Sequence, residues 1–129
     1  MRVYGLLVRN GKVLVAAEQL AGRNVLKFPG GAVEVGETPE HAVVREFQEE
    51  GQMTVRPTRL LYTPGTLFSP WTHADYTPIY YAVAGQGEPR VPDHEPLTLT
   101  FMDPDDFITS ELVAQPEIIA LSRALNGDQ

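Results

Sequence analysis

Three glutamates in the first half of the chain could carry metal-dependent phosphate chemistry. Glu46, Glu49 and Glu50 are spaced so that, in a helix, their carboxylates share one face within a single turn. Like charges at this spacing repel one another, and acidic groups near a helix C-terminus also oppose the helix dipole. A hard divalent cation would offset this repulsion, because Mg²⁺ prefers oxygen ligands and is usually shared with substrate phosphates. The spacing therefore indicates a magnesium and phosphate site.

The residues before these glutamates predict the helix that would position them. Thr38 can cap the free amides at the start of a helix, and Pro39 suits the first helical position, so we expect a helix from about Pro39 to Glu50. The loop before it contains three glycines that let the backbone approach a ligand closely: Gly30, Gly31 and Gly36. From helix and charge alone, a solvated acidic helix after an ordinary turn is an equal alternative.

The same run resembles the signature box of the Nudix hydrolases, Gly-x5-Glu-x7-Arg-Glu-U-x-Glu-Glu-x-Gly-U, in which U is apolar. The matching residues are Gly31, Glu37, Arg45, Glu46, Phe47, Glu49, Glu50 and Met53. So many fixed positions at fixed spacing favour this interpretation over the solvated helix. There is one departure, because Gln52 stands where the box has glycine. We expect the helix to end one residue sooner, with Gly51 in the left-handed position that follows a helix.

The resemblance implies an enzyme that breaks a pyrophosphate bond in a nucleoside diphosphate linked to another group, with Mg²⁺, or Mn²⁺ in its place, as cofactor. Carried over to this chain, it implies that Glu37 and Arg45 form a structural pair between loop and helix. It also implies that Glu49 is either a ligand or the general base, with Glu95, in a later loop, as a second candidate for the base. The implied metal ligands are Gly31 (through its carbonyl), Glu46, Glu49 and Glu50.

The substrate is less well defined than the bond. Bases are commonly held by aromatic stacking, and a loop arginine could reach a phosphate. The candidate substrate residues are Arg23, Phe68, Trp71 and Tyr80. Our first expectation is a (d)NTP or oxidised dNTP. Nucleotide sugars, ADP-ribose and dinucleoside polyphosphates stay open, as does a Nudix-fold module that binds nucleotides without hydrolysis, which Gln52 alone favours.

Composition limits the possible partners. The 129 residues suffice for one domain, and 17 acidic against 10 basic residues give a net charge of -7 that repels nucleic-acid polymers. Cysteine is absent, which excludes thiolate chemistry and disulfides. No apolar run approaches the roughly 20 residues of a membrane span, and the N-terminus lacks the features of a signal peptide. We expect a soluble, cytoplasmic protein that binds a small nucleotide and no membrane; a homodimer stays open.

The remaining elements are predicted to form a mixed sheet covered on both faces, the α/β/α sandwich of the Nudix fold. Asn10-Gly11 predicts a tight hairpin turn, and the polar run Glu18 to Asn24 predicts a loop. A second loop is expected from Pro64 to His73. The expected strands are Val3 to Val8, Val13 to Ala17, Val25 to Phe28, Thr54 to Tyr62, Ile79 to Ala84 and Leu97 to Met102. Further helices are expected after Asp103 and from Glu117 to Leu125, with Ile118, Ile119, Leu121 and Leu125 mostly on one face and a stop at Gly127.

Overall fold

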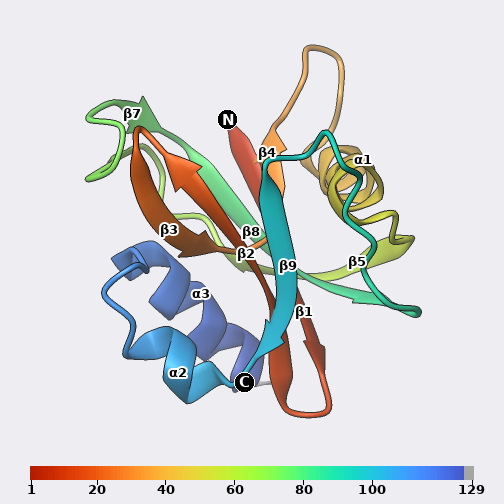
Figure 1. Cartoon of the computed structure of the whole chain (residues 1–129). Helices are drawn as coiled ribbons and strands as arrows, with labels where there is room; N and C mark the ends of the chain where they lie inside the picture. Colours follow the sequence, from red (N-terminus) through yellow and green to blue (C-terminus); the bar gives the residue numbers. More distant parts are fainter. Residues whose placement is uncertain (127–129) are drawn as a thin grey trace.

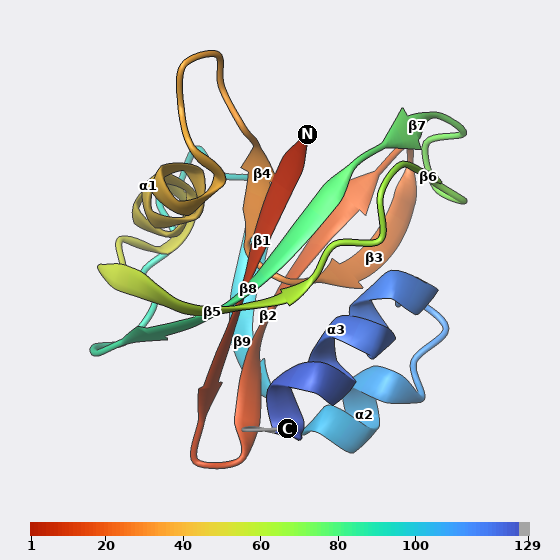
Figure 2. The ribbon, with the colours of Figure 1, turned by 180° about the vertical axis from the view of Figure 1, so that it is seen from behind.

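The computed structural model describes residues 1–126, which form a mixed sheet between two helical layers (Figure 1). Helix α1 (Pro39–Gly51) covers one face of the sheet. Helices α2 (Pro104–Ile108) and α3 (Gln115–Leu125) cover the other, as the view from behind also shows (Figure 2). The predicted α/β/α sandwich with a mixed central sheet is confirmed. No helix within these residues is long and apolar enough to cross a membrane.

Strand β1 is at the centre of the sheet. It pairs in parallel with β8, and antiparallel with β4 on one side and β2 at its far end. Strand β2 also pairs with β3 and β9, and β5 forms an outer edge beside β8. The strand bounds are β1 Arg2–Arg9, β2 Lys12–Leu20, β3 Arg23–Lys27, β4 Gly30–Ala32, β5 Val55–Tyr62, β8 Pro78–Gly85 and β9 Leu97–Met102, with a separate small sheet of β6 Leu67–Phe68 and β7 Asp75–Tyr76.

Two-residue turns close the first two hairpins. Asn10 and Gly11 both take positive φ between β1 and β2, which confirms the predicted turn. Ala21 and Gly22 do the same between β2 and β3, with φ of 52° and 78°. The loop expected over Glu18 to Asn24 is therefore wrong. Gly22 suits a turn, but alanine rarely takes positive φ, so the sequence does not mark Ala21-Gly22 as a two-residue turn; strand pairing continues up to it on both sides.

The later segments differ from the prediction in two places. The loop expected from Pro64 to His73 contains β6, which pairs with β7 to form a small hairpin. In helix α3, Leu121 is buried as predicted, and Ile118 and Ile119 are partly buried. The prediction is wrong for Leu125, which is 43% exposed, and it did not include the buried Ala120. The predicted stop at Gly127 lies outside the described residues.

The apolar core is divided by the sheet. One cluster packs under α1 and includes Val3, Leu7, Val43 and Phe47. The other packs under α2 and α3 and includes Tyr4, Leu6, Phe28, Tyr80, Phe107 and Leu121. Because neighbouring residues of β1 point to opposite faces, this strand contributes to both clusters. It therefore fixes α1 relative to the opposite helical layer.

Strand β1 can approach α1 closely because residue 5 is glycine. A Cβ added at Gly5 would lie 2.5 Å from Cε1 of Phe47 and 3.0 Å from Cγ2 of Val43. We expect Gly5→Ala to lower the free energy of unfolding by about 1–3 kcal/mol, since overpacking moves the helix or strains the ring. The measurement is urea unfolding. Val35→Ala, at a fully exposed side chain, is the matched control and should stay within about 0.5 kcal/mol of wild type. An unchanged midpoint for Gly5→Ala would contradict this packing.

Candidate active site

Helix α1 begins as its sequence predicts. The Thr38 side-chain oxygen accepts a hydrogen bond from the His41 N–H at 3.1 Å, and Pro39 occupies the first helical position. The carboxylate-bearing turns follow directly, so the cap sets where the helix starts and hence which residues face β4.

The prediction that the helix ends before Gly51 is wrong. Gly51 remains helical, and Gln52 takes the left-handed position with φ of 53°. The Gln52 N–H donates to the Gln48 carbonyl, which closes the last turn. A Cβ at position 51 would lie only 2.7 Å from Cδ1 of Leu99 on β9, so the glycine serves close packing rather than backbone handedness. The unusual Gln52 therefore leaves the helix, and the glutamates on it, in register.

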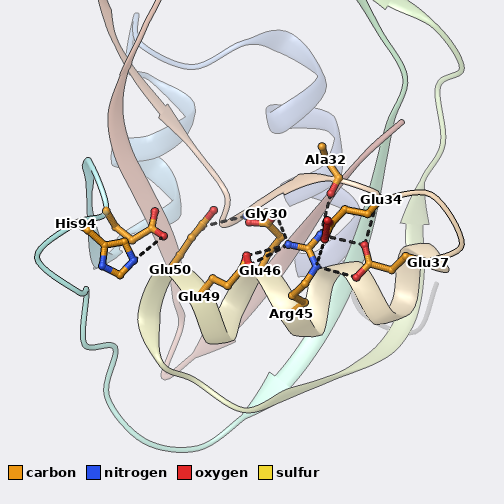
Figure 3. Close-up of polar contacts among 10 residues, drawn as sticks. Gly30, Ala32, Glu34, Glu37, Arg45, Glu46, Glu49, Glu50 and His94 are labelled. Carbon is orange, nitrogen blue, oxygen red and sulfur yellow. Dashed lines mark hydrogen bonds and ion pairs between the residues drawn. The ribbon is translucent and has the colours of Figure 1, made fainter.

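Arg45 connects the loop, the helix and β4 (Figure 3). Its Nε and Nη2 donate to the two oxygens of Glu37 at 2.7 and 3.0 Å, and Nη2 also donates to the Ala32 carbonyl at 3.0 Å. Its Nη1 donates to Glu46 at 3.1 Å and to Glu49 at 2.9 Å. The Arg45 guanidinium lowers the pKa of the Glu37 carboxyl to about 2. The two residues assigned to a structural pair are thus in direct contact.

Glu46 and Glu50 lie between α1 and the glycines of β4. Glu50 is only 7% exposed, and its Oε1 accepts a hydrogen bond from the Gly30 N–H at 3.3 Å. A Cβ at Gly31 would lie 2.6 Å from Glu46 Oε1, so only glycine leaves room for this carboxylate. Burial, together with the neighbouring Glu46 carboxylate, raises the pKa of Glu50 well above its ordinary value. Two acidic groups packed this closely need a proton or a cation between them.

The oxygen donors here suit a hard divalent cation. Carboxylates of Glu46, Glu49 and Glu50 and the Gly31 carbonyl are the ligand types that Mg²⁺ and Mn²⁺ prefer. Within residues 1–126, however, no three acidic or histidine side chains are already gathered as a metal cage. Arg45 holds Glu46 and Glu49 in their present positions. The donor chemistry fits a cation, while Arg45 supplies the positive charge in this arrangement.

Glu95, the second candidate for the base, lies in the loop before β9 and not on helix α1. Glu95 is partly exposed, and its Oε1 lies 3.7 Å from Nε2 of His94. Among the described residues it forms no hydrogen bond or ion pair with the glutamates of α1. It lines a shallow groove of about 370 Å³ with residues of β2 and β3. A catalytic role for Glu95 stays a prediction.

The four candidate substrate residues are scattered. Trp71 lines a cavity of about 260 Å³ between β3, the β6–β7 hairpin and the start of α3. Arg23 and Phe68 are exposed and do not line this cavity. Tyr80 is fully buried, with its ring 5.4 Å from that of Tyr4, so the expectation that it stacks on a base is wrong: no face of the ring is accessible.

Sequence reasoning missed four charged residues that line the same cavity, namely Arg2, Lys27, Asp75 and Glu117. Arg2 shares a face of β1 with Tyr4 and donates to its hydroxyl at 2.7 Å. Lys27 pairs with Glu18 and lies over the Tyr4 ring. Strand alternation could have placed Arg2 beside Tyr4, and Pro116 marks Glu117 as first-turn helix. Neither pattern shows that the charged side chains of β1, β3 and α3 line one cavity.

Comparison with known proteins identifies relatives. A NUDIX domain family model matches residues 1–122. The 8-oxo-dGTP diphosphatase of Escherichia coli (strain K12) is 68% identical over 31 residues, 24% of each chain. An RNA pyrophosphohydrolase of Mannheimia succiniciproducens is 38% identical over 58 residues, which are 45% of this chain and 29% of the relative. The matched segments therefore span less than a third of these relatives.

Solved structures share the fold over nearly the whole chain. The MutT NUDIX hydrolase from Burkholderia pseudomallei superposes with a TM-score of 0.79 and 24% identity over 95% of each chain. The NUDIX hydrolase from Nitrosomonas europaea gives a TM-score of 0.83 and 18% identity, over 99% of this chain and 89% of that one.

The contact between Glu37 and Arg45 predicts how stability depends on pH. The pKa of Glu37 is about 2 in the folded protein, below its ordinary 4.5, so ionised Glu37 contributes stability above pH 4.5 that is lost as pH falls towards 2. We expect Glu37→Gln to be less stable than wild type at pH 6 in urea unfolding, with the difference shrinking between pH 4.5 and 2. Glu88→Gln, whose side chain is 82% exposed, should match wild type throughout. A Glu37→Gln effect that is constant with pH would refute the pairing as its cause.

Proposed function

The chain belongs to the NUDIX domain family, and from this premise we propose that it hydrolyses a pyrophosphate bond in a nucleoside diphosphate linked to another group. The observation that carries the proposal is the pair formed by buried Glu50 and half-buried Glu46, packed against Gly30 and Gly31 beside the Arg45 guanidinium. This arrangement concentrates negative charge where only a cation or proton can balance it. A cation placed there would in turn attract the phosphates of a substrate.

The substrate we propose first is a (d)NTP or oxidised dNTP. The name of the Escherichia coli relative, 8-oxo-dGTP diphosphatase, supports this class. The cavity beside Trp71 has room for a small group such as one nucleobase, because its 260 Å³ lies just under the approximately 300–1,000 Å³ of drug-sized sites. Two linked nucleosides would exceed it.

We propose Mg²⁺ as the cofactor, with Mn²⁺ able to replace it. The residues that would hold it are Glu46, Glu49 and Glu50, with the carbonyl of Gly31. When bound, such a cation neutralises charge on phosphate oxygens and makes water a better nucleophile.

Three side chains of α1 have separate roles in the proposed reaction: Glu50, Glu49 and Arg45. Glu50 is fixed by burial and by the Gly30 N–H, so its oxygens cannot drift from β4. The Glu49 side chain is 48% exposed and can reach solvent, so we assign it the role of taking a proton from the attacking water. Arg45 orients Glu49 through the hydrogen bond at 2.9 Å. We favour Glu49 over Glu95 as the base, because Glu49 shares a helical face with Glu46 and Glu50.

Gln52 gives little support to a module that binds without hydrolysis. It takes the left-handed position that glycine would otherwise occupy, and no glutamate moves out of register. A non-glycine residue in this conformation costs of order 1 kcal/mol, which affects stability rather than chemistry.

Replacing Glu50 tests the proposed reaction. We expect Glu50→Gln to lower the rate of dNTP hydrolysis with Mg²⁺ by at least about 100-fold, because it removes a charged ligand worth several kcal/mol to the transition state. Products are followed by mass, with EDTA as the metal-free control. Glu88→Gln is the control variant and should retain the wild-type rate, because the Glu88 side chain is 82% exposed.

Thermal unfolding distinguishes lost chemistry from lost folding. Mg²⁺ should raise the melting temperature of the wild type, because a ligand that binds only the folded state stabilises it, and should leave Glu50→Gln unchanged. If folded Glu50→Gln hydrolysed dNTPs at the wild-type rate, Glu50 would not be part of the active site.

A further inference from the structure

The last turn of α1 contains several features that destabilise the end of a helix. It carries Glu49 and Glu50, and within the described chain it contains no basic residue to offset them or the helix dipole. Gly51 is a poor helix former, and Gln52 after it takes positive φ. The position of this turn therefore relies on contacts from outside α1.

The loop between β8 and β9, residues 86–96, supplies such a contact. The Arg90 N–H donates a hydrogen bond to the Gly51 carbonyl at 2.8 Å, which satisfies one of the carbonyls that a helix leaves free at its C-terminus. A Cβ at Gly51 would lie 2.7 Å from Cδ1 of Leu99 and 3.7 Å from Cβ of Pro89, so the loop and β9 both pack against this turn. In both views the loop runs past α1 (Figures 1 and 2). The residue that it contacts directly follows Glu50.

The side chain of Arg9, the last residue of β1, holds the start of the same loop. Its Nη1 donates to the Gly87 carbonyl at 2.7 Å and its Nη2 donates to the Gly85 carbonyl at 2.8 Å. The guanidinium also lies over the Phe101 ring of β9, 5.0 Å from the ring centroid. A Cβ at Gly87 would meet no atom within 4 Å, so the hydrogen bond from Arg9, rather than side-chain packing, restrains this part of the loop. One planar group thus connects the end of β8, the loop and β9.

We propose that Arg9 is a positioning residue for the cation-binding turn of α1 and acts through the β8–β9 loop, which rests on the proposed function. Gly87 and Arg90 are three residues apart, so a shift of the Gly87 carbonyl passes along a short backbone segment to the N–H that binds Gly51. Gly51 is bonded in turn to Glu50, the buried carboxylate of the proposed site. Without Arg9 the loop can move away from the end of α1. The last turn then loses the hydrogen bond and the packing that keep its carboxylates in register.

Binding of Mn²⁺ without nucleotide, measured by electron paramagnetic resonance of the free ion, tests this role without any turnover. We expect Arg9→Met to weaken Mn²⁺ binding about threefold to tenfold, less than the roughly 10- to 100-fold typical of residues that hold a metal ligand directly, because Arg9 acts through the loop. Arg9→Lys should fall between Arg9→Met and the wild type, since it keeps a cation over Phe101 but cannot donate to both carbonyls in one geometry. Lys12→Met removes an exposed cation from the same hairpin, so it is the matched control and should bind Mn²⁺ as the wild type does.

Hydrogen exchange of backbone amides locates the effect along the helix. In Arg9→Met, the amides of Glu50 and Gly51 should exchange at least about threefold faster than in the wild type, whereas those of Val43 and Val44 in the middle of α1 should be unchanged. Hydrolysis of dGTP at low Mg²⁺ should fall by a similar factor and recover at saturating Mg²⁺, because the carboxylates are displaced and not removed.

The outcomes separate this role from the hydrolysis itself. If Arg9→Met weakens Mn²⁺ binding but the wild type hydrolyses no nucleotide, the role of Arg9 holds and the proposed function fails. Wild-type Mn²⁺ affinity in folded Arg9→Met, or exchange that is raised equally along the whole of α1, overturns the role of Arg9 whatever the rate of hydrolysis. If thermal unfolding shows that Arg9→Met does not fold, Arg9→Lys decides, and wild-type Mn²⁺ affinity in that variant overturns the proposal. A wild type that binds no Mn²⁺ overturns both.

Discussion

The contacts of Arg45 are the constraint on which the site depends. One guanidinium reaches Glu37 in the loop, the Ala32 carbonyl at the end of β4, and Glu46 and Glu49 on its own helix. The loop contains glycines, which restrain the backbone little, and the helix carries carboxylates that repel one another. The planar, permanently charged group joins them with several hydrogen bonds in one geometry, which a lysine could not reproduce.

Around Arg45, the carboxylates of Glu46 and Glu50 repel each other, and a bound cation would relieve this repulsion. Glu50 is buried next to Glu46, and the pKa of Glu50 is raised because neither burial nor a like charge favours ionisation. Such a pair opposes folding in the absence of a cation, and becomes favourable when one binds. The core under α1, with Phe47 packed against β1 at Gly5, holds the helix in place despite this repulsion. Stability and chemistry thus come from opposite faces of the same helix.

Local chemistry in the sequence was enough to predict the helix from Pro39, the Asn10-Gly11 hairpin and the layered fold. It failed where tertiary contacts decided. Residue 51 is glycine because Leu99, distant in sequence, leaves no room for a side chain there, and the helix continues through it to Gln52. The pairing of β2 with β3 carries both strands to the Ala21-Gly22 turn. Glu117 could not be found because a glutamate in a first helical turn is normally a surface residue. Only its position under the β6–β7 hairpin makes it part of a cavity.

The most direct test of the central claim, that the carboxylates at β4 form a cation-dependent hydrolytic site, is ³¹P NMR of dGTP with the wild-type protein in ¹⁸O-labelled water. The account predicts that cleavage between phosphates requires Mg²⁺ or Mn²⁺, stops with EDTA, and places ¹⁸O in a released phosphate product. Intact dGTP after prolonged incubation with metal and folded protein, or equal cleavage in EDTA, would contradict it.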